Sequence, residues 1–464
     1  MTIQEIIEKK EGKAEDTIAA LKQKPIAIPA WSGVQGLERE YYTKYHPVMD
    51  RAKYPDVAHK DGSVEFVTRI PQNLQALATA RMAELCFGIP VNYDITTDGS
   101  TEQDRAATIF RNILQRNRID AVNIERGKLF FASCEVMTLW YAVKEENMLY
   151  GEKSKVKYRC MHFSPMLGDA IYPLFDEEGD LVALSLEYVR KKAGKELRYF
   201  DCYTADRHIQ WMSKGAGWIE QEDERHEVGK IPAVYVWRPE PIWGNNSPIV
   251  YEIEWALSRN GNYLRKNSKP VFAVFANEGI DFGQEKDEKS EFRSILQFPE
   301  GGSAQYITWQ QAVENLKYYV AELRSSYFSQ LQIPDWSYEN MKSTPMSGEA
   351  RKQLFIDAQL KVTEESGRLV EFLDREVNVI KALMKKEWPE LANAIEAMQV
   401  NVSITPYSIN DERDTIDLLM AANGGKPLMS HRESIAAYGH SSDVERTLQE
   451  IAEDEQRSVF EGGI

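Results

Sequence analysis

The chain has 464 residues, a formal net charge of −16, 43% hydrophobic residues and 28% charged residues. A chain of this length and composition can bury a sizeable core, and we expect about two to four domains or one elongated fold with insertions. The acidic balance argues against a tight, general binder of duplex DNA, which needs lysine and arginine to displace counterions. It does not argue against a protein that surrounds DNA while repelling it.

Membrane and disulfide features are lacking in the sequence. The N-terminal residues have no apolar core of a signal peptide, and no stretch reaches the roughly 18 consecutive apolar residues of a membrane helix. We therefore expect a protein made in the cytoplasm, with no membrane partner. The four cysteines, which form no CxxC pair, are expected to be reduced and mostly buried: Cys86, Cys134, Cys160 and Cys202.

The first half of the chain alternates helical and strand-like patterns. A polar helix over residues 1–23 precedes a proline- and glycine-containing arm. Apolar residues at helical spacing predict helices from Pro71 to about Cys86 and from Thr101 to Arg116, with Thr101 as the N-cap and a short strand, VNYDI, between them. From about Lys128 to Arg238, aromatic and β-branched segments separated by turns predict a strand-rich region.

The second half is mainly helical. Helices are predicted over 247–267 and 310–332, separated by a compact mixed region, and an irregular polar segment follows Pro334. A long helix then begins near Ser347 and runs to about Trp388, with Ser366 and Gly367 as a possible kink. Residues 389–464 are predicted to be mostly helical and acidic, with fourteen Asp and Glu against five Lys and Arg.

Sequence motifs for enzymes are absent. The chain contains no GxGxxG, Walker A, HExxH or GxSxG motif, and its seven histidines are scattered. We therefore predict no catalytic residue, no cofactor and no metal site. Composition alone leaves open an acidic two-metal nuclease, because carboxylates are abundant.

Four segments, taken in their order, resemble the portal proteins of siphovirus-type tailed bacteriophages. The resemblance covers roughly residues 65–390, and the SG-x-A step from Ser347 to Ala350 is its most informative piece. The segments are FGIPVNYDI (87–95), HEVGKIPAVYV (226–236), SPIVYEIEWALSRNGNYLRKNS (247–268) and IPDWSYENMKSTPMSGEARKQL (333–354).

The resemblance implies an α+β portal fold. Its expected parts are an N-terminal arm and helix (1–64), an α/β wing (65–246), a first stem helix (247–267), a small α/β clip (268–308), a second stem helix (309–332), a tunnel loop (333–346), a long kinked helix (347–388) and an acidic helical crown (389–464).

The resemblance also implies a function and partners. Such proteins form a ring of about twelve copies at one capsid vertex of the virion, and the ring is the conduit for packaging and ejecting DNA without sequence specificity. Implied partners are further copies of the chain, the large terminase subunit, a head-completion or adaptor protein, and the major capsid and scaffolding proteins, with assembly in the host cytoplasm.

Two sets of site residues follow from the resemblance. The tunnel loop that would face DNA contains Tyr338, Glu339, Asn340, Met341, Lys342, Ser343 and Thr344, with Lys342 as the phosphate contact. The clip residues that would dock partners are Asp281, Glu285, Asp287 and Glu288. The alternatives left open are another head or neck structural protein, and a metal-dependent packaging nuclease.

Overall fold

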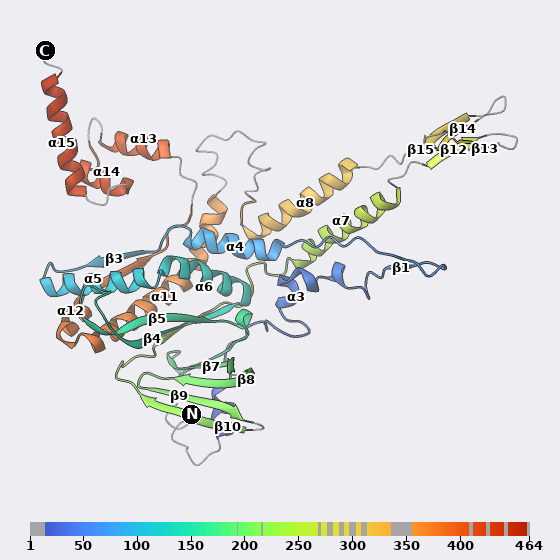
Figure 1. Cartoon of the computed structure of the whole chain (residues 1–464). Coiled ribbons are helices and arrows are strands. Elements are labelled where there is room, and N and C mark those ends of the chain that lie inside the picture. The colour runs from blue at the N-terminus through green and yellow to red at the C-terminus, as the bar shows by residue number, and fades with distance from the viewer. Residues whose placement is uncertain are drawn as a thin grey trace.

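The computed structural model shows an α+β protein in which helices and antiparallel sheets share one body (Figure 1). Two helices and a small strand region project from this body, and the C-terminal helices stand apart from it elsewhere (Figure 1). No helix in the part of the chain that is described is long and apolar enough to cross a bilayer. The structure describes residues 14–192, 194–214, 217–267, 271–275, 282–286, 292–296, 303–307, 313–335, 355–407, 412–423, 427–439 and 444–461.

Four helices and a three-stranded sheet enclose the main core. α6 approaches α4 so closely that a Cβ added at Gly127 would stand 2.9 Å from the ring of Phe87, so this position requires glycine. All strands of the sheet are antiparallel, in the order β11-β4-β5. The elements are α4 (Leu74–Phe87), α5 (Thr101–Arg116), α6 (Ile119–Ser133), α11 (Ile356–Glu387), β4 (Glu135–Asn147), β5 (Ser154–Phe163) and β11 (Ala233–Trp237).

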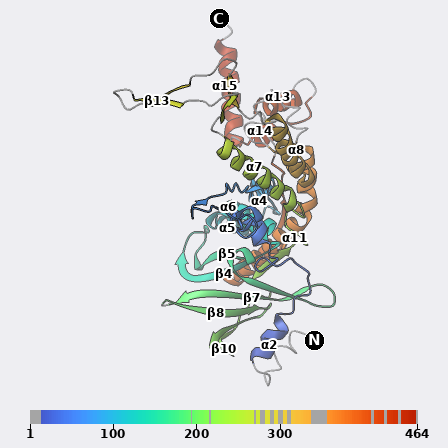
Figure 2. The ribbon, with the colours of Figure 1, turned by 90° about the vertical axis from the view of Figure 1, so that its right-hand side faces the viewer.

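A second sheet is a five-stranded antiparallel meander in the order β10-β9-β8-β7-β6. The N-terminal helix α2 (Ala14–Leu21) lies against this sheet (Figure 2), and its Ile18 and Leu21 are buried with Phe200 and Trp211. Apolar residues of α2 thus cover this face of the sheet. The strands are β6 (Ala170–Phe175), β7 (Leu181–Lys192), β8 (Lys195–Tyr203), β9 (Arg207–Lys214) and β10 (Gly217–Arg225).

The projecting part begins with α7 (Ser247–Asn267) and returns along α8 (Val313–Leu331). Between them in sequence, β12 pairs with β15 and β13 pairs with β14, all antiparallel. The strands are β12 (Val271–Phe275), β13 (Phe282–Lys286), β14 (Phe292–Leu296) and β15 (Ser303–Ile307), and the C-terminal helices are α13 (Glu412–Asn423), α14 (His431–Tyr438) and α15 (Val444–Glu461).

Residues 389–403 belong to the body rather than to the acidic C-terminal helices with which the sequence analysis grouped them. Leu391, Ile395 and Met398 are buried in the main core, and β16 (Gln399–Ser403) pairs with β3 (Asn92–Thr96). A strand of five residues gives a weak sequence signal when its partner lies far away in the chain. Between α11 and β16 lie η4 (Pro389–Leu391) and α12 (Ala392–Ala397).

Three local expectations can be compared with the structure. The cap of α5 is Ser100, whose hydroxyl accepts from the Gln103 amide, and not Thr101. The strand-rich region starts at Glu135 rather than near Lys128, because α6 is enclosed on several sides and shows no single apolar face. The four cysteines are free, and three are buried.

A buried ion pair fixes α11 in the middle of the body. Arg126 on α6 donates to both carboxylate oxygens of Glu376, each at 2.7 Å, and the Trp140 indole donates to the same carboxylate at 2.9 Å. Both charged side chains are 2% exposed. A second buried pair joins Arg238 to Glu365 at 2.9 Å. Burying two charges is costly unless each is well paired, so positions of α11 that break these contacts are disfavoured.

We expect Glu376→Gln to lower the free energy of unfolding by about 3–5 kcal/mol, because it leaves the Arg126 guanidinium buried without its counter-charge. Urea unfolding followed by tryptophan fluorescence measures the change. The matched control is Glu371→Gln on the same helix, whose exposed partner is Arg375 and whose loss should be below about 0.5 kcal/mol. Equal losses in the two variants would contradict the role given to the buried pair.

Candidate functional site

The α7–α8 hairpin projects from the body (Figure 1), and its base is set into the body. The two helices lie side by side (Figure 1), and the Tyr319 hydroxyl donates to a Glu252 carboxylate oxygen at 3.0 Å. At the body end of α8, Tyr327, Phe328 and Leu331 are buried in the main core. The hairpin is therefore held at its base and exposed further out.

Buried polar contacts hold the start of α7. His46 Nδ1 lies 2.6 Å from Glu254 Oε1, both side chains are fully buried, and His46 Nε2 lies 2.8 Å from the Glu40 carbonyl oxygen. The Glu40 carboxylate accepts from Trp243 Nε1 at 2.7 Å and from Ser247 Oγ at 2.6 Å. The N-terminal segment is thus fastened to the first turns of α7.

The chain that leaves α8 is anchored at Asp335. Gln332 has a positive φ of 55°, which turns the chain at the end of α8. Arg324 Nε donates to Asp335 Oδ2 at 2.7 Å, and Arg81 NH2 donates to Asp335 Oδ1 at 3.1 Å. The Arg81 guanidinium also lies over the Phe328 ring, 4.7 Å from its centroid, and donates to the Pro334 carbonyl.

Charge pairing at this anchor shifts the pKa of Asp335. Burial raises the pKa of the carboxyl, but the hydrogen bond and charge of Arg324 and the charge of Arg81 outweigh burial, so the net pKa lies below its ordinary value. Asp335 therefore stays ionised wherever the protein is folded at neutral pH.

The segment that follows Asp335 ends at another fixed point. Phe355 is buried in the main core immediately before α11, and α11 itself is held by the two buried ion pairs. Residues 336–354 therefore connect two anchored positions, one at the end of the hairpin and one at the start of α11.

The predicted site residues fall largely outside the part of the chain that the structure describes. All seven predicted tunnel-loop residues, Tyr338, Glu339, Asn340, Met341, Lys342, Ser343 and Thr344, lie outside the described residues. Among the predicted clip residues, Glu285 lies in β13 opposite Arg293 of β14, whereas Asp281, Asp287 and Glu288 lie outside the described residues.

The sequence analysis did not predict the ion pairs that hold α11 and Asp335 in place. Glu365 and Glu376 share the apolar face of α11, where an acid flanked by buried residues such as Leu369 and Phe372 signals a buried partner. Arg81 and Arg126 sit in apolar helical segments in the same way. Within the described residues, no group of three or more His, Cys, Asp and Glu side chains could hold a metal ion.

Comparisons with known proteins identify the family. Residues 32–459 match the family described as "Phage portal protein, SPP1 Gp6-like". Since the match spans most of the chain, this protein belongs to the phage portal protein family, which confirms the predicted resemblance. The family is structural rather than enzymatic.

Other comparisons give weaker likenesses. A chain in "Virion of native gene transfer agent (GTA) particle" is similar with a TM-score of 0.40 and 11% identity, over 91% of this chain and 97% of that one. A chain in "Neck of empty GTA particle computed with C6 symmetry" is similar with a TM-score of 0.39 and 10% identity, over 86% of this chain and 95% of that one. No curated protein matches the chain.

We expect Asp335→Asn to lower the free energy of unfolding by about 2 kcal/mol at pH 7, because two arginines lose their charged acceptor. Since the folded-state pKa of Asp335 is lowered, the stabilisation is present above the unfolded-state value near 4 and is lost as the pH falls through the folded-state value. Urea midpoints of both proteins between pH 7 and pH 3 measure this. The exposed control Glu146→Gln should show no such difference, and a difference that grows toward acid would contradict the anchor.

Proposed function

We propose that this chain is one subunit of a closed ring of about twelve copies, located at one capsid vertex of a tailed-phage particle. Family membership supports the proposal. The observation that carries it further is the hairpin and the anchored positions Asp335 and Phe355, which hold both ends of residues 336–354. Because both ends of this segment are fixed in every copy, each copy in a ring would hold the segment at the same distance from the ring axis.

The parts of the fold take the following roles in this proposal. Residues 65–246 form the wing, α7 and α8 the stem, and residues 268–308, with β12–β15, the clip. Residues 333–346 are assigned to the tunnel loop, residues 347–388, which include α11, to the long helix, and the helices that follow Ser403 to the crown. The N-terminal 64 residues fasten the wing and stem through α2 and the Glu40 and His46 contacts.

Charge supports a conduit through which DNA slides. The chain carries a net charge of −16, and twelve copies around a duplex would repel its phosphates rather than adhere to them. In the tunnel loop Lys342 would supply one phosphate contact per subunit, weak enough to break at each step. The ring itself would be inert as an enzyme, with the energy for translocation coming from the terminase.

The proposed partners follow from position in the particle. The clip, with Asp281, Glu285, Asp287 and Glu288, would dock the terminase and later a head-completion or adaptor protein. The wing and crown would contact the major capsid and scaffolding proteins during assembly in the host cytoplasm.

Labelling intact particles tests the proposal directly. Particles of the phage that encodes this chain, assembled with an affinity-tagged copy and decorated with gold, should carry label at a single vertex. Label on every vertex or along the tail would contradict the portal role.

We expect Lys342→Glu to reduce DNA packaging or retention several-fold while ring assembly is unchanged, because a phosphate contact becomes a repulsive charge. DNase-protected DNA per particle measures packaging, and electron microscopy measures rings. The control Lys191→Glu reverses an exposed lysine on β7 and tests whether any lost positive charge has the same effect. Normal packaging by Lys342→Glu would show that this contact is not needed.

A further inference from the structure

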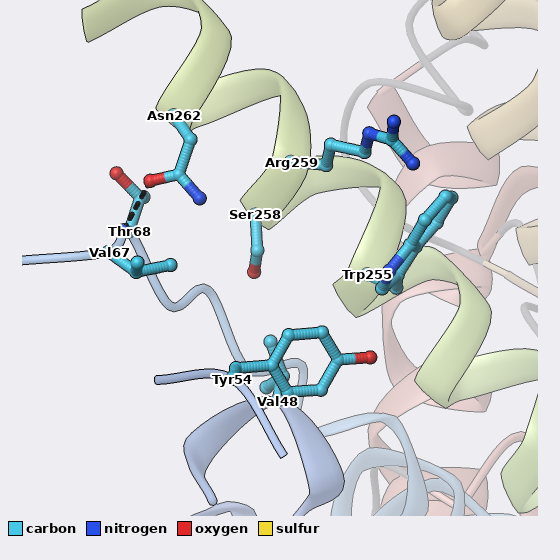
Figure 3. Close-up of a pocket in the computed structure, with 8 residues that line it drawn as sticks. All are labelled: Val48, Tyr54, Val67, Thr68, Trp255, Ser258, Arg259 and Asn262. Atoms are coloured by element: carbon cyan, nitrogen blue, oxygen red, sulfur yellow. Dashed lines mark hydrogen bonds between the residues drawn. The ribbon is translucent and has the colours of Figure 1, made fainter. Parts of the chain in front are cut away.

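A cavity on α7 opens between this helix and the N-terminal arm (Figure 3). Its volume is about 260 Å³, and Trp255, Arg259, Tyr54 and Val48 are among the residues that line it. Arg259 stacks on Trp255 at 4.9 Å from the ring centroid, and the two side chains extend side by side (Figure 3). Pockets for organic ligands usually exceed about 300 Å³, so this one better fits a single large side chain.

The outer face of α8 carries such a side chain. Tyr318 is 71% exposed. It lies two residues from Val320, which packs on the main core, and two residues correspond to about 200° around a helix, so Tyr318 points to the other side. The neighbouring Tyr319 reaches Glu252, one turn before Trp255, which places Tyr318 near the level of the cavity along the hairpin.

Charges on the two surfaces are partly complementary, although on α8 the exposed Lys317 beside Tyr318 pairs with Glu314 at 3.6 Å. Glu314 and Glu322 are exposed, each four residues from Tyr318 along α8, and such residues are neighbours on a helix surface. The cavity instead has two exposed arginines beside it. Arg259 lines the cavity, and Arg265 lies two turns along α7 from the lining residue Ser258. Basic residues at this place in an acidic chain favour contact with an acidic surface.

We propose that Tyr318 of one copy inserts into the α7 cavity of the next copy, with Glu314 and Glu322 facing the arginines at its edge. The inference rests on the proposed ring and names the contact that closes it. The two surfaces belong to different helices of the hairpin, so their contact between copies is heterologous, and such a contact generates a ring when the rotation closes. Tyrosine, tryptophan and arginine are the residues that most often dominate such interfaces.

Paired cysteines in the full-length chain test the contact. In Arg259→Cys/Tyr318→Cys, mild oxidation should join neighbouring copies and give a ladder of covalent multimers on a denaturing gel, which a reductant collapses to one band. The control Leu264→Cys/Tyr318→Cys uses a position that is 51% exposed and lies about 180° from Trp255 around α7, and it should give no ladder. The parent chain, whose thiols are buried or half-buried, should give none either.

Electron microscopy of the same samples distinguishes a failure of the Tyr318 contact from a failure of the proposed ring. Rings without a ladder, or a ladder equal to that of the Leu264 control, would overturn the Tyr318 contact and leave the ring intact. A chain that forms neither rings nor a ladder, both alone and with the capsid and scaffolding proteins present, would overturn both. As a further check, Tyr318→Ala should lower the fraction of chain in rings several-fold, whereas Tyr318→Phe, which keeps the aromatic ring, should not.

Discussion

The carboxylate of Glu376 is the interaction on which the arrangement of the body depends. It accepts from Arg126 on α6 and from Trp140 on β4, elements more than 230 residues away in the chain. An unpaired charge in this core would be very unfavourable, so a shift of α11 along its axis that separates Glu376 from Arg126 is disfavoured. The position of α11 also determines where Phe355 enters the core and hence where residues 336–354 end.

Buried polar contacts also hold the parts that are proposed to act on DNA. Asp335, paired with Arg81 and Arg324, fixes the other end of residues 336–354. The contact between His46 and Glu254 fixes the base of α7. Rigid anchors in the body thus support elements that are exposed further out. The conduit proposed for this chain would need this division, because its inner surface would have to repel DNA while its subunits remain firmly joined.

Sequence patterns predicted the regular elements well and the anchors poorly. Helices α4, α5, α7 and α8 were predicted because their apolar residues recur at helical spacing. The enclosed helix α6 and the short strand β16 were missed, since one lacks a single apolar face and the other depends on a distant partner. The ion pairs of Glu376 and Asp335 could not be predicted because a sequence does not show which charges meet. The tunnel-loop assignment rests on family resemblance alone and stays a prediction.

The central claim, that copies of this chain close into a ring around a channel, is tested most directly by electron microscopy of the purified full-length protein together with its native mass. The account predicts rings of about twelve copies with a central opening wide enough for duplex DNA. A homogeneous monomer or dimer, both in isolation and with the capsid and scaffolding proteins present, would contradict it.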